Sequence, residues 1–84
     1  MTTDELVTYL EELGYLVEND EFTVVVWYVF GRRKMGKAKM AWINKVHVNN
    51  YHIYGVGPET ENKKRMSDVI HTYAQTSIIK RKNR

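Results

Sequence analysis

The chain has 84 residues, no cysteine, one proline, 43% hydrophobic residues and a formal net charge of +3. A chain of this length forms one small domain and buries only about 60–65% of the surface that its unfolded form exposes, which leaves little volume for an enclosed catalytic cavity. Without cysteine there is no disulfide-stapled secreted scaffold. Length and composition therefore favour a non-catalytic binding module that needs no cofactor.

The small net charge conceals two opposed blocks. Residues 1–21 contain seven acidic residues and no Lys or Arg, which gives a charge of −7. The remainder contains thirteen basic and three acidic residues, which gives +10. Such blocks create local fields that steer charged partners more strongly than the net charge suggests, although an acidic helix close to a basic hairpin would partly neutralise it.

The amino-terminal residues are acidic, and the longest apolar run, from Val24 to Phe30, is too short to cross a bilayer. We therefore expect a cytoplasmic protein with no membrane partner. No linker or repeat divides the chain, so residues 1–79 are expected to form a single compact domain and residues 80–84 a frayed basic tail.

The first predicted element is a helix that begins at Thr2 or Thr3. Thr2 and Glu5 have the spacing of a capping box, and Gly14 is typical of a helix end. The apolar stripe that this helix would bury consists of Leu6, Leu10 and Leu13.

Strands are predicted next. Residues 15–18 form a short apolar segment that a turn at Asn19-Asp20 would connect to residues 22–30, a β-branched and aromatic run. A hairpin connection over residues 31–36 leads to a strand over 37–43. The last strand is expected over residues 46–54, unless Asn49-Asn50 divides it into a small hairpin.

A second helix is expected after Gly55-Val56-Gly57-Pro58, capped by Thr60 or Asn62. Its apolar face would consist of Met66, Val69, Ile70 and Tyr73. The order of elements predicts an α+β domain: a helix, a three- to four-stranded antiparallel meander and a C-terminal helix.

Both faces of the predicted sheet are apolar. If Phe30 pairs with Lys37, one face carries Phe22, Val24, Val26, Tyr28, Phe30, Ala41 and Ile43, and the other carries Val25, Trp27, Val29, Ala38, Met40 and Trp42. Two helices on the same side would leave Trp27, Met40 and Trp42 uncovered, as candidates for a partner or homodimer interface. One helix on each side would bury them.

The stretch from His71 to Arg81, HTYAQTSIIKR, resembles the "EYAxTPIxxR" ending of many small uncharacterised proteins of phages and prophages of low-GC Gram-positive bacteria, with Ser77 in place of the proline. Leu13-Gly14-Tyr15 and Val17 fit the "LGY-V" front segment of the same proteins. The resemblance implies an accessory protein of a mobile element that acts in the bacterial cytoplasm on the host or on phage DNA, and it supplies no catalytic residues. A purely architectural role for the motif is the alternative.

The histidines at 47, 52 and 71 do not form a metal site by spacing, because no cysteine or nearby carboxylate completes a ligand set. Ser77 lacks the setting of a nucleophile. Gly55-x-Gly57-Pro58 lacks the third glycine of a dinucleotide fingerprint and the lysine of a P-loop. Neither an enzyme nor a metal or cofactor site is predicted.

Basic residues gather near the predicted hairpin and at the C-terminus, where they are candidates for nucleic-acid contacts beside aromatic side chains. They are Arg32, Arg33, Lys34, Lys37, Lys39, Lys80, Arg81 and Lys82. A basic hairpin tip also discourages edge-to-edge strand pairing, so solubility is the plainer explanation.

Two functions follow from the sequence. The first is a non-catalytic phage or prophage accessory protein that binds and inhibits or redirects a host protein or nucleoprotein complex, such as a defence complex in the manner of an anti-CRISPR. The second is a small DNA- or RNA-binding protein that uses the basic hairpin and tail.

Overall fold

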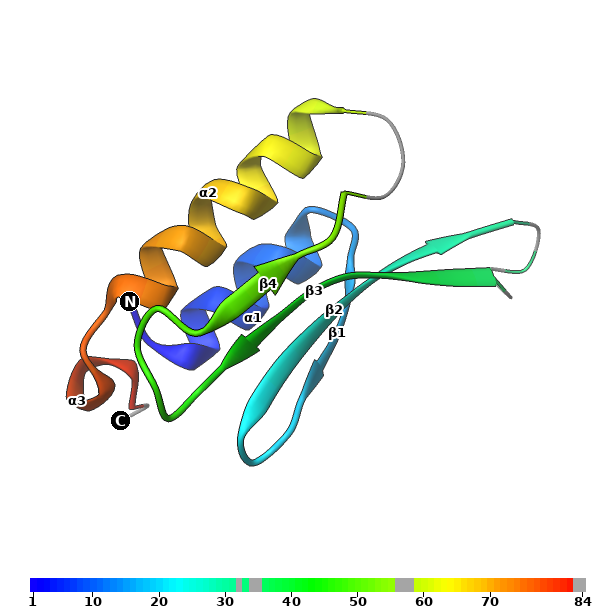
Figure 1. Cartoon of the computed structure of the whole chain (residues 1–84). Helices are drawn as coiled ribbons and strands as arrows, with labels where there is room; N and C mark the ends of the chain where they lie inside the picture. Colours follow the sequence, from blue (N-terminus) through cyan, green and yellow to red (C-terminus); the bar gives the residue numbers. More distant parts are fainter. Residues whose placement is uncertain (32, 34–35, 56–58, 83–84) are drawn as a thin grey trace.

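The fold is an antiparallel sheet with two long helices, seen in a computed structural model that describes residues 1–31, 33, 36–55 and 59–82 (Figure 1). The elements are α1 (Thr3–Glu12), β1 (Leu16–Asn19), β2 (Thr23–Phe30), β3 (Gly36–Asn44), β4 (Tyr51–Ile53), α2 (Glu61–Gln75) and α3 (Ile78–Arg81). The four strands form one sheet in the order β1-β2-β3-β4. The predicted α+β meander is confirmed, with α3 as an additional short helix.

Helix α1 begins with the capping box that the sequence indicates. The backbone N–H of Glu5 donates to the Thr2 hydroxyl at 3.1 Å, and the Glu5 carboxylate accepts from the backbone N–H of Thr2 at 2.8 Å. The hydrogen bond from the Thr2 backbone lowers the pKa of the Glu5 carboxyl. Gly14 ends the helix with a φ of 99°, a conformation that costs glycine little.

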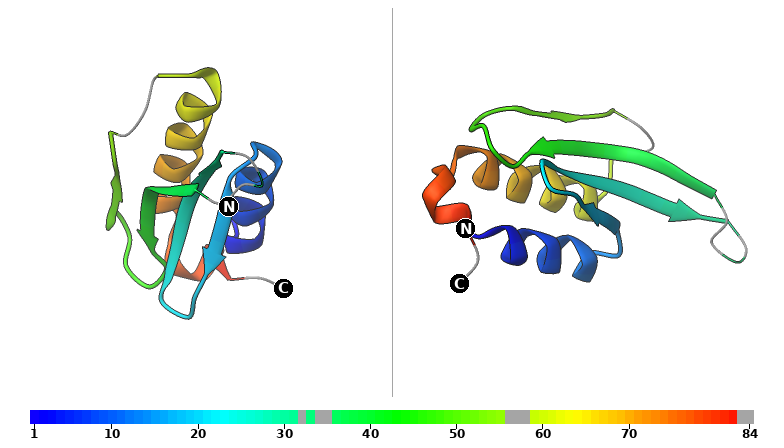
Figure 2. Two further views of the ribbon diagram at one scale, coloured as in Figure 1. Left: turned by 90° about the vertical axis from the view of Figure 1, so that its right-hand side faces the viewer. Right: turned by 90° about the horizontal axis from the view of Figure 1, so that it is seen from below.

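Helices α1 and α2 lie on the same side of the sheet, and no described element covers the other side (Figure 2). The core lies between the helices and the sheet. It contains Leu6 and Leu10 from α1, Val24, Val26, Met40, Ala41 and Ile43 from the sheet, and Met66, Val69, Ile70 and Tyr73 from α2. The arrangement with one helix on each side is therefore wrong.

Strands β2 and β3 extend beyond the other elements as a projecting hairpin (Figure 2). β1 pairs with β2 only from Val24 to Trp27, and β4 pairs with β3 only from Ala41 to Ile43. Beyond these residues, β2 and β3 therefore pair only with each other. On the helix side of the hairpin, Tyr28 and Phe30 are 50% and 47% exposed and stack on each other.

The register of this hairpin differs from the predicted one. Phe30 pairs with Gly36 rather than with Lys37. A Cβ atom at position 36 would lie 2.6 Å from the Phe30 ring, so the ring occupies the space that glycine leaves free. Packing of an aromatic ring over a strand glycine stabilises this pairing.

A β-bulge at Met40 accounts for the difference of one residue between the observed and the predicted register. Val26 pairs with Ala41, as expected, whereas Trp27 pairs with Lys39. A bulge directs two consecutive side chains to one face, and Met40 and Ala41 are both buried against the helices. The bulge also places Ala38 opposite Tyr28, on the helix side of the hairpin, so the predicted faces of Ala38 and Met40 are wrong.

The last strand is much shorter than the predicted range 46–54. The Asn44 side chain accepts from the backbone N–H groups of Val46 and His47, which turns the chain directly after β3. Asn49 then donates its backbone N–H to the carbonyl of Ala74 in α2. Since these backbone groups are used by the turn and by α2, only Tyr51–Ile53 joins the sheet.

Candidate functional site

The uncovered side of the sheet, here called the open face, combines aromatic and basic side chains. From β1 to β4 it consists of Leu16, Glu18, Val25, Trp27, Val29, Lys37, Lys39, Trp42 and His52, with Tyr54 directly after β4. The strands bring these residues together because side chains two positions apart share a face. The partner candidates Trp27 and Trp42 both lie here.

Trp27 lies at the base of the projecting hairpin, and side chains from β1 and β3 contact it. The Lys37 ammonium lies 4.4 Å and the Lys39 ammonium 5.4 Å from its ring centroid. The Trp27 indole N–H donates to the Glu18 carboxylate on β1. Two cations thus rest on one indole, an arrangement that attraction to the ring's negative face stabilises.

Trp42 lies on the neighbouring strand, between Val25 on β2 and His52 on β4. The His52 ring contacts Tyr54 edge-on, with centroids 4.5 Å apart and planes at 77°. The aromatic surface therefore continues from the hairpin base across to β4. His52 and Tyr54 were not predicted to belong to this surface. The register between β3 and β4 depends on the turn that joins them, and the sequence alone did not indicate the length of that turn.

Met40, the third partner candidate, does not belong to this surface. The bulge turns it toward the helices, where only 5% of its surface is exposed. The prediction that Met40 contacts a partner is therefore wrong, and its role is to fill the core.

The basic candidates do not form one continuous track. Lys37, Lys39 and Arg33 are exposed on the hairpin, whereas Lys80 and Lys82 are exposed at α3, at the other end of a molecule 40 Å long (Figure 1). Arg32 and Lys34 lie outside the described residues. The candidate surface is consequently the hairpin with the open face, without the C-terminus.

Arg81 is not a nucleic-acid contact, because it is 2% exposed. Its guanidinium donates to four backbone carbonyls, those of Asn44 at 2.8 Å, His47 at 3.3 Å, Ala74 at 2.8 Å and Thr76 at 3.0 Å. It also lies 4.4 Å from the centroid of the Tyr73 ring. The predicted fraying from Lys80 is wrong for the described part of this segment, because Arg81 fastens α3 to α2 and to the turn before β4.

The C-terminal motif has a structural explanation in these contacts. The Tyr73 hydroxyl forms a hydrogen bond of 2.7 Å with Thr3, and the Thr3 hydroxyl donates to the carbonyl of Arg81. Ala74 and Thr76 supply carbonyls to the Arg81 guanidinium. Ser77 occupies the cap position of α3, although its side chain makes no capping hydrogen bond. Residues that match the motif thus connect the start of α1 with α3 and the end of α2. They are Tyr73, Ala74, Thr76 and Arg81.

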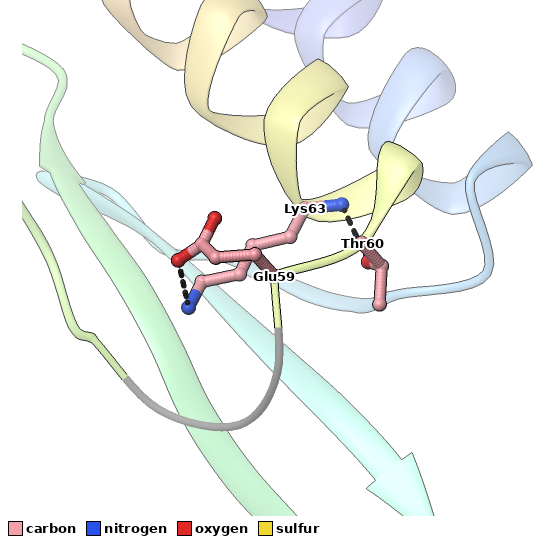
Figure 3. Close-up of polar contacts among 3 residues, drawn as sticks. All are labelled: Glu59, Thr60 and Lys63. Carbon is pink, nitrogen blue, oxygen red and sulfur yellow. Dashed lines mark hydrogen bonds and ion pairs between the residues drawn. The ribbon is translucent and has the colours of Figure 1, made fainter.

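A groove of about 420 Å³ between β4 and α2 contains a buried cation, Lys63. The side chain of Lys63 is 9% exposed, and its ammonium lies 3.1 Å from the Glu59 carboxylate (Figure 3). The Thr60 hydroxyl accepts from the Lys63 backbone N–H and so caps α2. Since Glu61 and Asp68 also line this groove, it does not favour an anionic ligand.

The histidines serve separate local contacts. The His71 ring makes hydrogen bonds with Tyr51 at 2.6 Å and with Gln75 at 3.0 Å, and His52 contacts Tyr54. Across residues 1–31, 33, 36–55 and 59–82, no three side chains of His, Cys, Asp or Glu come close enough together to hold a metal ion. Gly57 and Pro58 of the glycine-rich turn lie outside the described residues.

Comparison of the chain with protein-family models, with curated proteins and with solved structures finds no match. In the part of the chain that the structure describes, no helix has the length and apolar character needed to span a bilayer.

Proposed function

We propose that this protein is a non-catalytic accessory protein of a phage or prophage that binds a host macromolecule through the open face and thereby inhibits or redirects it. The observation that carries the proposal is the position of Trp27 and Trp42 on a sheet face that neither helix covers. Both side chains are half-buried. Partly exposed aromatic side chains on an uncovered sheet face are typical of a binding surface. The resemblance of the C-terminal motif supplies the phage context.

The opposed charge blocks suit a partner that is a host protein or a nucleoprotein complex, such as a defence complex. Direct binding of DNA or RNA is the second candidate, and Lys37 and Lys39 favour it. Among the described residues, neither lysine forms an ion pair with a carboxylate, so both ammonium groups are available to phosphates.

Affinity capture with matched variants tests the role of the open face. The tagged protein is incubated with a lysate of a low-GC Gram-positive bacterium, with and without nuclease. The open-face variant carries Lys39→Glu and His52→Glu, and the control carries Lys64→Glu and Thr72→Glu, two exposed positions on α2. Both variants change the formal charge equally and leave the core intact.

We expect wild type and control to retain the same partner through a moderate-salt wash and the open-face variant to lose it. Retention after nuclease treatment identifies a protein partner, and loss after it identifies nucleic acid. Equal recovery by both variants, or no partner with any form, would contradict the proposal.

A further inference from the structure

The exposed acidic side chains of α1 and the lysines of the open face lie on opposite sides of the sheet. Acidic side chains of the first block, Asp4, Glu5, Glu11 and Glu12, are exposed on α1, which lies on the helix side. In the four described strands, Glu18 is the single acidic residue, and its carboxylate is engaged by the Trp27 indole. The open face and hairpin therefore present cations to a partner while α1 faces away, and this orientation suits a polyanion.

Lys37 and Lys39 place two cations side by side over Trp27. They are two residues apart on one strand, so their Cα atoms are separated by about 6.8 Å along it. Their ammonium groups lie 4.4 Å and 5.4 Å from the centroid of the Trp27 ring. A nucleic-acid backbone that crosses this position can therefore pair a phosphate with each ammonium group, and withdrawal of the two ammonium groups from Trp27 would uncover the indole ring beneath them.

The aromatic residues are placed for bases rather than for more phosphates. Trp42 lies opposite Val25, and Trp27 is two residues further along the same strand, so the two indoles are diagonal neighbours on adjacent strands. Diagonal neighbours are about 7–8 Å apart, which leaves room for a separate base over each ring. His52 and Tyr54 continue the surface beyond Trp42.

A duplex cannot use such a surface, because its bases are stacked on one another and present only their edges. Single strands can, since unpaired bases stack on aromatic side chains while basic residues follow the backbone. We propose that the open face binds single-stranded nucleic acid, with bases stacked on Trp27 and Trp42 and phosphates paired with Lys37 and Lys39. This inference rests on the proposed function, because it takes the open face as the binding surface. It adds the chemical class of the partner.

Tryptophan fluorescence tests the inference directly, because the only two tryptophans of the chain, Trp27 and Trp42, are both in the proposed site. Oligonucleotides of about 12 nucleotides suit the site sizes of single-strand binders. DNA and RNA versions of the same sequence, and the corresponding duplex, are titrated into the protein at low salt. We expect quenching by a single strand and weaker binding of the duplex. A preference for RNA would indicate a contact to the 2′-hydroxyl, and equal or tighter DNA binding would indicate none.

Matched lysine variants separate this surface from the C-terminus. The double variant Lys37→Gln and Lys39→Gln should lower the slope of log affinity against log salt by about 1.4, because each phosphate that a lysine neutralises adds about 0.7 to the slope. The control with Lys80→Gln and Lys82→Gln has the same change in charge and should leave the slope unchanged. Trp42→Leu should weaken binding about 5- to 150-fold, the loss of one stacked base.

Absence of quenching by either single strand at low salt would overturn the inference, as would duplex binding as tight as single-strand binding. If Trp42→Leu does not fold, the wild-type titration and the two lysine variants still decide the question. Failure of oligonucleotide binding, together with host capture that depends on the open face, would leave the proposed function standing with a protein partner. Capture that is indifferent to the open face would instead remove the proposed function itself.

Discussion

Replacement of Arg81 by methionine should lower the free energy of unfolding by about 3 kcal/mol or more, because it removes four hydrogen bonds that a charged, buried donor makes to backbone carbonyls. The guanidinium is enclosed by Asn44, His47, Ala74 and Thr76, whose carbonyls accept from it, and by the Tyr73 ring. For a domain of this size, such a loss corresponds to a fall in melting temperature of roughly 12–24 °C. Urea denaturation monitored by circular dichroism measures it.

The control is Lys80→Met, an exposed neighbour on α3, which should change stability by no more than about 0.5 kcal/mol. Arg81→Lys keeps the charge but cannot reach all four carbonyls from one ammonium group, so it should recover only part of the loss. A loss below about 1 kcal/mol for Arg81→Met would contradict the burial of this side chain. Such a result would indicate that the Arg81 side chain is exposed, like the other basic residues of this segment.

Replacement of Met40 by alanine should cost about 2–5 kcal/mol, the usual range for truncation of a buried methionine. The expectation depends on the bulge, because a regular register would place Met40 on the open face, where truncation costs far less. Thermal and urea unfolding measure the effect. Met40→Leu, which keeps the apolar volume, should cost less than about 1.5 kcal/mol.

A cost below about 1 kcal/mol for Met40→Ala would show that the side chain is outside the core. That outcome would restore Met40 to the open face and shift Trp27 relative to Lys39. The stability of this variant therefore also tests the cation arrangement over Trp27, which the same bulge creates.

Local signals in the sequence predicted the elements well. The capping box at Thr2 and Glu5, the end of α1 at Gly14 and the apolar stripe of α2 depend on residues within a few positions of one another. The β-branched run at 22–30 likewise predicted β2 to within one residue. Nearest-neighbour preferences suffice for such features.

Long-range features were not accessible in the same way. The pairing of Phe30 with Gly36 and the resulting bulge at Met40 depend on how an aromatic ring packs over a glycine and on the separate demand of the core at Val26 and Ala41. A shift of one residue reverses the faces of the β3 side chains between the hairpin turn and the bulge, so the predicted placement of Met40 failed, whereas the pairs from Ala41 onward are the expected ones.

Arg81 shows the same limit for charge. A cluster of basic residues near a chain end is typical of a solvated tail, and nothing in the local sequence indicates that one of them is enclosed by carbonyls from the end of α2 and from the distant turn after β3. The surrounding motif residues were recognised by resemblance, but their common partner was not. The positions of Trp27 and Trp42 on one face, in contrast, followed from the alternation of the strands.

The central claim is that the open face of the sheet is the binding surface. Its most direct test is a two-dimensional ¹⁵N–¹H spectrum recorded while a single-stranded oligonucleotide is added, since each tryptophan contributes one indole N–H signal. We predict that the signals of Trp27 and Trp42 shift together as the oligonucleotide is added, while the guanidinium Nε–H signal of Arg81 stays in place. Unmoved indole signals, with shifts confined to Lys80, Lys82 or the exposed side of α2, would contradict the claim.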